Sequence, residues 1–204
     1  MPAITDGRSS RSRLAEKSQA SVEALLTVAR ATFGRLGYAR ASLEGVAAEA
    51  RMTKGAVYHH FGSKEALFEA VFRVEHRRMI ALVAAAGGAG DPLDAIARGA
   101  RAYLRAILDP VARRILLQDG PAVLGWERWR RCEEPGFQQL LEGSLAAAAK
   151  RGLLRRGLRP ADTAVLLLGA MTEGALTVAH SATPSTAARR LATELALHIA
   201  GLRA

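Results

Sequence analysis

The sequence predicts an all-α protein of about nine helices, arranged as a small N-terminal head and a larger C-terminal domain. Apolar residues recur three and four positions apart along most of the 204 residues, which is the spacing of a helix. Several of these segments begin after Ser, Thr or Asp, the residues that cap helix N-termini. No segment shows the apolar–polar alternation of a half-buried strand. The clearest break is the glycine-rich stretch at residues 87–90, and we place the boundary between the two parts just before it, near residue 86.

The N-terminal part begins with a basic arm and one long helix. Residues 1–17 are polar and carry four basic side chains, which favours a flexible arm, although basic arms can also contact nucleic acid. Apolar residues at helical spacing predict a helix at residues 17–36. Gly37 can supply the left-handed residue that often follows the last helical turn.

Two short helices follow, and they are the most informative feature of the chain. Ser42 is a good N-cap for a helix at residues 43–49, and Thr53 is a good N-cap for a helix at residues 54–60. Residues 50–52 form the tight turn between them. Short helices joined in this way form a helix-turn-helix, which places its second helix in the major groove of DNA. The sequence therefore predicts double-stranded DNA as a partner.

The second short helix carries side chains that are suited to reading DNA. Lys54 can donate hydrogen bonds to guanine, and Gly55 allows the backbone to approach the duplex closely. Tyr58 and His59 present polar tips to bases, whereas hydroxyls at helix N-termini can hold phosphates. The predicted DNA contacts are Ser42, Thr53, Lys54, Gly55, Ala56, Tyr58, His59, His60 and Lys64.

The remaining segments predict six further helices. Their expected positions are residues 64–86, from residue 92, from residue 110, 137–150, 161–181 and from residue 184 onward. Proline after aspartate marks two of the starts, and the middle region is expected to be interrupted around Gly120 and at Pro135. The segment at residues 161–181 is apolar on nearly every side, so we expect a helix that is buried all round.

The chain is basic, and its charge is concentrated near the N-terminus. The formal net charge is +10 at pH 7, and half of the residues are hydrophobic. Residues 1–64 carry 10 basic and 5 acidic side chains, whereas the remaining 140 residues carry 19 and 14. This pattern favours a polyanionic partner, either nucleic acid or an anionic membrane surface, although a basic surface can also be merely solvated.

Three observations favour a cytoplasmic protein. Cys132 is the only cysteine, so an intrachain disulfide is excluded, which is typical of a reducing compartment. Residues 1–18 lack the apolar stretch of a secretion signal. The apolar run at residues 164–171 is much shorter than the about 20 residues of a membrane span, so we expect no membrane contact.

The stretch SLEGVAAEARMTKGAVYHHFGSKEALF, at residues 42–68, resembles the signature of the tetracycline-repressor family of bacterial regulators. The resemblance covers about residues 17–70. The matching positions are Ser42, Val46, Ala47, Ala50, Thr53, Gly55, Val57, Tyr58, His60, Phe61, Lys64 and Leu67. Arg51 departs from the pattern, because the family usually has glycine in the turn. A non-glycine residue at positive φ costs roughly 1 kcal/mol, so either the turn is strained or its geometry differs.

The resemblance implies a homodimer, an operator near a regulated gene, and a small-molecule effector bound in the C-terminal part. It divides the chain into an arm (1–17), a DNA-binding domain (18–86) and a ligand-binding and dimerisation domain (91–204). Apolar walls with a few polar groups are typical of small-molecule sites. The pocket candidates are Trp126, Trp129, Phe137, Met171 and Glu173. The dimer-interface candidates, on the last two predicted helices, are Leu167, Leu191, Leu195 and Ile199.

The function that follows is a ligand-responsive transcriptional regulator, a repressor that a small molecule releases from a near-palindromic operator. A non-specific architectural DNA-binding protein and a small helical enzyme are the alternatives. The sequence shows no nucleophile–base pair, glycine-rich phosphate loop or metal-ligand cluster, so we expect no catalytic residue, cofactor or metal site.

Overall fold

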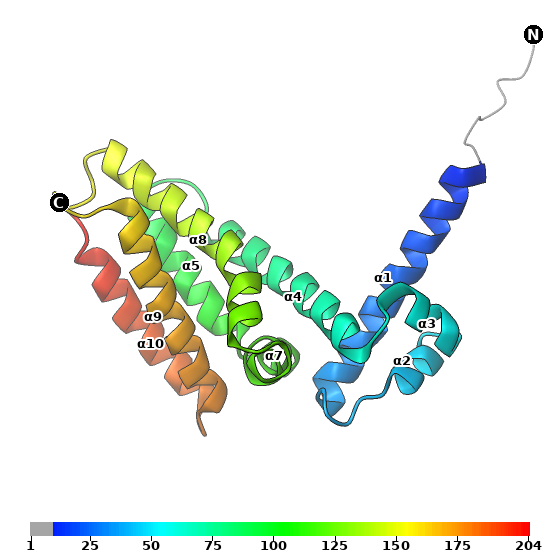
Figure 1. Ribbon diagram of the computed structural model, residues 1–204. Helices are drawn as coiled ribbons and strands as arrows, with labels where there is room; N and C mark the ends of the chain where they lie inside the picture. Colours follow the sequence, from blue (N-terminus) through cyan, green and yellow to red (C-terminus); the bar gives the residue numbers. More distant parts are fainter. Residues whose placement is uncertain (1–9) are drawn as a thin grey trace, which may run out of the picture. The chain divides into compact units, whose positions relative to one another are not determined.

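The computed structural model describes residues 10–204, without the side chains of residues 10–15, 17, 18 and 133–135. That part of the chain contains ten α-helices, one short π-helix and no strand, which confirms the predicted all-α fold (Figure 1). The elements are α1 (Ser10–Leu36), α2 (Leu43–Glu49), α3 (Lys54–Phe61), α4 (Lys64–Gly87), α5 (Pro92–Ala106), α6 (Pro110–Arg113), η1 (Arg114–Asp119), α7 (Gly120–Leu124), α8 (Trp126–Lys150), α9 (Pro160–His180) and α10 (Pro184–Ala200).

The chain divides into two compact units, and the division falls within α4, after Val71. The first helix begins at Ser10 rather than at residue 17, so residues 10–17 of the predicted arm are helical. Residues 1–9 of that arm lie outside the described residues. The predicted boundary near residue 86 concerned functional domains, and it stays a prediction.

The first unit is built around aromatic side chains of α1 and α4. Phe33 and Phe68 are fully buried, and their ring centroids lie 5.2 Å apart in an edge-to-face arrangement. The end of α2 is tied to α1 through one carboxylate, since Glu49 accepts hydrogen bonds from Thr32 Oγ1 at 2.6 Å and from Arg35 Nη2 at 2.7 Å. These contacts fix the position of α2 against the long first helix.

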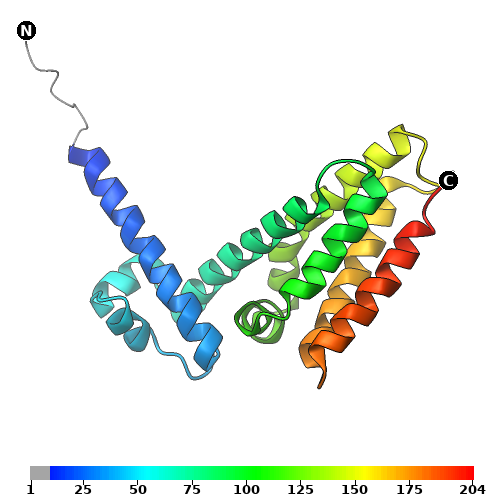
Figure 2. The same ribbon diagram turned by 180° about the vertical axis from the view of Figure 1, so that it is seen from behind.

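The second unit is a group of four long helices, α5, α8, α9 and α10. Helix α5 packs against the other three, and α9 also packs against α8 and α10. Figure 2 shows α5 and α10 side by side. Buried apolar side chains fill the space between them, among them Leu104, Ile107, Leu145, Ala175 and Ile199. Burial of this apolar surface is the main stabilising contribution to the unit.

The middle region differs from the prediction at α8. We expected a break at Pro135 and a helix that starts at Phe137, but the helix runs without interruption from Trp126 to Lys150. Both halves of α8 carry buried side chains, Trp129 before residue 135 and Leu141 after it. Tertiary packing on both sides of the proline thus outweighs its local effect, since a proline inside a helix removes one backbone hydrogen bond.

Trp129 anchors the π-helix and α7 to α8. Its side chain is fully buried, and its indole Nε1 donates a hydrogen bond to the carbonyl of Leu116 at 2.8 Å. Gly120 packs into the same part of the core and leaves no room for a side chain. A Cβ atom there would come within 2.9 Å of the Phe72 ring and of the Ile115 carbonyl. The indole therefore belongs to a tightly packed part of the core.

Arg203, near the C-terminus, clamps the start of α5. Its Nη1 lies 2.7 Å from Asp91 Oδ2, and its Nη2 donates to Asp94. Asp91 is also the N-cap of α5, where it accepts a hydrogen bond from the Leu93 amide at 2.8 Å. The Arg203 guanidinium is the main cause that lowers the pKa of Asp91 from 3.8 to about 2. The charged form of Asp91 is therefore the form that the fold stabilises.

We expect the ion pair between Asp91 and Arg203 to make the free energy of unfolding depend on pH in the acidic range. The stabilisation is complete above the unfolded pKa of Asp91, near 3.8, and is lost as the pH falls through about 2. Arg203→Gln should flatten the decline of the unfolding free energy between pH 4 and pH 2, as measured by urea denaturation. Arg159→Gln is the control, since Arg159 pairs with Asp162 only on the open surface. A decline of equal steepness in Arg203→Gln and the native protein would contradict the expectation.

Candidate DNA-binding face and ligand cavity

The predicted helix-turn-helix is present in the first unit, as α2 and α3. The Ser42 hydroxyl accepts a hydrogen bond from the Gly45 amide at 3.0 Å, and the Thr53 hydroxyl accepts one from the Ala56 amide at 3.2 Å. Both predicted N-caps are therefore confirmed. Val57 of α3 is fully buried, so the opposite face of this short helix is turned to solvent.

The exposed face of α3 carries the predicted base-reading side chains. Lys54, His59 and His60 are exposed, and Tyr58 keeps 41% of its surface accessible. A Cβ atom at Gly55 would meet nothing within 4 Å, so packing inside the protein does not require glycine there. These side chains form one polar surface that is free to meet a duplex. Their contacts with DNA stay predictions.

A carboxylate that we did not predict lies beside this surface. Glu44 Oε1 of α2 is 2.6 Å from Lys54 Nζ of α3. The hydrogen bond between them raises the pKa of Lys54 and lowers that of Glu44. Both side chains are more than half exposed, so the pair can exchange with solvent or with a ligand at little cost. The two residues have no helical spacing, and only the turn between α2 and α3 brings them together.

Lys64 is turned toward the protein. Its Nζ donates hydrogen bonds to the carbonyls of Tyr38 and Ala41, both at 3.0 Å, and lies 4.2 Å from the centroid of the Tyr38 ring. The ammonium thus ties the loop between α1 and α2 to the start of α4. A phosphate contact by Lys64 would require it to leave these two carbonyls.

Arg51 carries strain in the turn between α2 and α3. Its φ is 54°, and it is the only described residue other than glycine with positive φ. This conformation costs an L-residue about 1–2 kcal/mol. Of the two alternatives that the sequence left open at this position, a strained turn and a different geometry, the structure shows the strained turn.

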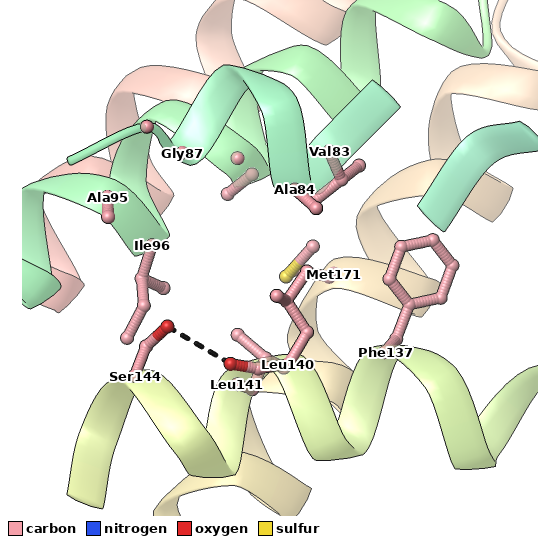
Figure 3. A pocket seen from close by; sticks show the side chains of 13 residues that line it. Val83, Ala84, Gly87, Ala95, Ile96, Phe137, Leu140, Leu141, Ser144 and Met171 are labelled. Carbon is pink, nitrogen blue, oxygen red and sulfur yellow. Dashed lines mark hydrogen bonds between the residues drawn. The ribbon is translucent and has the colours of Figure 1, made fainter. Parts of the chain in front are cut away.

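The second unit contains an apolar cavity of about 100 Å³ (Figure 3). Its walls come from the end of α4, the first half of α5, the middle of α8 and one residue of α9. The lining residues are Val83, Ala84, Gly87, Gly88, Ala95, Ile96, Gly99, Ala100, Phe137, Leu140, Leu141, Ser144 and Met171. Ser144 Oγ donates a hydrogen bond to the carbonyl of Leu140 at 3.0 Å, as the dashed line in Figure 3 marks.

Two of the five predicted pocket residues line the cavity, and three do not. Phe137 and Met171 line the cavity. Trp129 is fully buried in the core next to the π-helix, whereas Trp126 is 59% exposed and lies against the Trp129 ring at 5.0 Å. Glu173 is exposed on α9. The prediction missed the walls from α4 and α5, for which the only sequence signal was the high proportion of alanine and glycine at residues 84–100.

A second, open groove of about 500 Å³ runs between α9 and α10. Leu167, Leu191 and Leu195 line it, together with Glu173, whereas Ile199 is 1% exposed and lies in the core. Leu166, which is 74% exposed, also lines the groove, and Val165 (50%) and Leu197 (63%) are further exposed large apolar side chains on the same two helices. The expectation that the helix at residues 161–181 is buried on all sides is therefore wrong for the single chain.

Two further properties bear on the class of protein. Among the described helices, α9 is long and apolar enough to cross a membrane by length and composition alone, and 56% of its most apolar stretch is buried. Core helices of soluble proteins can have the same length and composition. Among the described residues, no three His, Cys, Asp or Glu side chains are grouped to hold a metal ion.

A helix-turn-helix with an open second helix, joined to a helical unit that contains an apolar cavity, defines a DNA-binding transcriptional regulator. Residues 25–71 match the family described as bacterial regulatory proteins, tetR family. Residues 93–202 match the domain described as tetracyclin repressor-like, C-terminal domain. The chain therefore belongs to the TetR family of bacterial regulators, as the resemblance implied.

Individual relatives agree with this assignment. A TetR-family transcriptional regulator from Pectobacterium atrosepticum has the same fold, with a TM-score of 0.81, 28% identity, and coverage of 92% of this chain and 96% of that one. The transposon Tn10 TetC protein of Escherichia coli is 24% identical over 151 residues, which are 74% of this chain and 75% of that protein. A helix-turn-helix transcriptional repressor of Mycobacterium tuberculosis is 36% identical over 73 residues, 36% of this chain and 39% of that one.

Proposed function

We propose that this regulator is a dimeric, cytoplasmic repressor that binds a near-palindromic operator and leaves it when a small molecule binds the second unit. The exposed polar face of α3 is the observation that carries the proposal. Lys54 and Tyr58 lie on that face, with the Lys54 Nζ 5.5 Å from the centroid of the Tyr58 ring. A lysine that reads guanine and a tyrosine that contacts a base or phosphate are suited to sequence recognition in a major groove.

The second copy of the chain covers the groove between α9 and α10. Leu166 is apolar and 74% exposed in the single chain, so its burial against a partner would stabilise the dimer. Glu173 and Glu194 border the groove beside His198, so polar groups flank its apolar surface. Packing of these two helices against the same two of a partner gives a four-helix arrangement. We therefore assign α9 to the protein core and the dimer interface rather than to a membrane.

The cavity is the proposed effector site, and α9 connects it with the dimer interface. Met171 of α9 lines the cavity. Leu167 and Gly174 lie one turn before it and one turn after it on the same helix, and both line the groove. A ligand that displaces Met171 therefore acts on a helix that the partner also contacts. Release from DNA requires that the ligand binds the non-binding arrangement of the dimer more tightly.

Lys54→Ala and Tyr58→Ala should each weaken specific DNA binding by about 10- to 100-fold, because each loses contacts worth about 1–3 kcal/mol. The duplex is the DNA upstream of the protein's own gene or, failing that, a fragment selected from the genome by the native protein. Affinity is compared with that for random duplex at physiological salt. Thermal unfolding of both variants should match that of the native protein, since both side chains are exposed.

Lys150→Ala is the control, because Lys150 is an exposed lysine at the end of α8 in the second unit and lines neither the cavity nor the groove, so specific binding should be unchanged. Unchanged specific binding in both α3 variants would remove α3 as the recognition helix. Equal affinity of the native protein for its selected fragment and for random duplex would instead indicate a non-specific architectural protein.

A further inference from the structure

We infer that the effector is a small, uncharged, largely apolar molecule that donates one hydrogen bond to Ser144. The inference rests on the proposed function, because it takes the cavity as the effector site. It follows from the chemistry of the cavity wall, from the one hydroxyl in that wall, and from the volume of the cavity.

The wall offers nothing that would stabilise a charge. None of the 13 lining residues carries an ionisable side chain. The Gly87 carbonyl at the rim already accepts a hydrogen bond from Arg98 Nε at 3.0 Å. Arg98 also donates to the Ala89 carbonyl and does not line the cavity. A carboxylate or an ammonium in this cavity would be desolvated without a partner, which strongly disfavours its binding.

Ser144 sets the one polar requirement. Its hydroxyl proton is donated to the carbonyl of Leu140, one helical turn earlier. The oxygen can therefore accept a hydrogen bond but has no proton left to donate. A neutral alcohol, phenol or N–H group satisfies this acceptor, whereas a ligand that can only accept leaves it unpaired. Figure 3 shows Ser144 at one end of the cavity, near Ile96, and Phe137 at the other end.

The position of the Met171 side chain determines how large a ligand the cavity can hold. An apolar cavity of about 150 Å³ accommodates benzene in another protein, so about 100 Å³ is too small for a ring without movement. Met171 is 2% exposed and unbranched, and its thioether can adopt other rotamers more easily than the branched side chains around it. A molecule with one ring therefore fits when Met171 turns aside.

The test compares phenol, toluene and benzoate, which share a ring and differ in donor capacity and charge. Each is titrated by calorimetry into the full-length native protein, Ser144→Ala, Met171→Ala and the control Ser185→Ala, whose serine lies outside the cavity on α10. For the native protein and the control we expect phenol to bind about fivefold more tightly than toluene, the effect of one hydrogen bond of about 1 kcal/mol. Benzoate should bind at least roughly a hundredfold more weakly than phenol.

The variants locate the binding within the cavity. Ser144→Ala should bind phenol and toluene with equal affinity, and Met171→Ala should bind both more tightly than the native protein. Benzoate binding as tight as phenol binding would overturn the inference. So would a phenol preference that survives in Ser144→Ala, or binding that is insensitive to Met171→Ala.

The inference and the proposed function fail in distinguishable ways. Specific DNA binding is measured separately, without any probe. A protein that binds its operator but prefers benzoate is still a repressor with a different class of effector. A protein that binds all DNA equally but prefers phenol in the expected order retains the cavity chemistry and loses the proposed function.

Discussion

Leu166→Arg should convert the proposed dimer into a monomer and lower the affinity for the proposed operator by about a hundredfold or more. Leu166 is the most exposed large hydrophobic side chain of the described residues, at 74%, and it lines the groove between α9 and α10. An arginine on each copy would place two like charges in an apolar interface, which is strongly destabilising. Two linked DNA-binding units gain their affinity from simultaneous binding, and a monomer loses that gain. Sedimentation equilibrium and operator titration measure the two effects.

The choice of position makes this experiment decisive. Leu195 and Ile199 are 8% and 1% exposed in the single chain, so a charge at either would disturb the protomer core as well. Leu82→Arg is the matched control, because Leu82 is 42% exposed on α4 and does not line the groove. A Leu166→Arg protein that is folded and still dimeric would exclude this face of α9 from the interface.

Trp129→Ala should lower the free energy of unfolding by about 3–5 kcal/mol, the range for a buried aromatic residue truncated to alanine. The change leaves a cavity beside Gly120 and removes the hydrogen bond to the Leu116 carbonyl, which then lacks its indole partner. The midpoint of thermal unfolding should fall by roughly 10 °C. Differential scanning calorimetry measures both quantities.

Trp126→Ala is the internal control for this experiment. The two indoles touch, with ring centroids 5.0 Å apart, but Trp126 is 59% exposed. Its removal should change the unfolding free energy by no more than about 0.5 kcal/mol, as expected for an exposed position. Equal and small effects in the two variants would contradict the core position of Trp129. They would also leave open the role of ligand contact that the sequence predicted for Trp129.

The sequence predicted local structure well, because caps and periodicity are local signals. Ser42 and Thr53 cap their helices as expected, since a hydroxyl at the first turn satisfies an amide wherever the helix lies. The contacts of Lys64 in the folded protein could not be predicted from such local signals. Its basic side chain and its place near the recognition helix indicated a phosphate ligand, whereas carbonyls more than 20 residues earlier hold it in the free protein.

The apolar cavity was predictable only in part, because a cavity depends on where the side chains of packed helices leave space unfilled. Large residues such as Trp129 drew attention, yet they fill space rather than leave it. The small residues Ala84, Ala95 and Gly99 leave the volume that Met171 borders. Their pattern carries no signal until α4, α5 and α8 are placed against each other. The same limit applies to α9, which was expected to be buried on all sides but exposes Val165 and Leu166, because composition does not tell a side buried within the chain from a side left for a partner.

The pairing of Glu44 with Lys54 changes how many ions DNA binding releases. A free lysine that neutralises one phosphate of B-DNA releases about 0.9 of a condensed cation. Lys54 is bonded to a carboxylate at 2.6 Å, and the pair as a whole carries no net charge. If Lys54 moves onto DNA, the Glu44 carboxylate stays beside the phosphates and offsets part of the charge that the lysine neutralises. We therefore expect this contact to release fewer cations than an unpaired lysine would, and to add less to the ionic-strength dependence of the affinity.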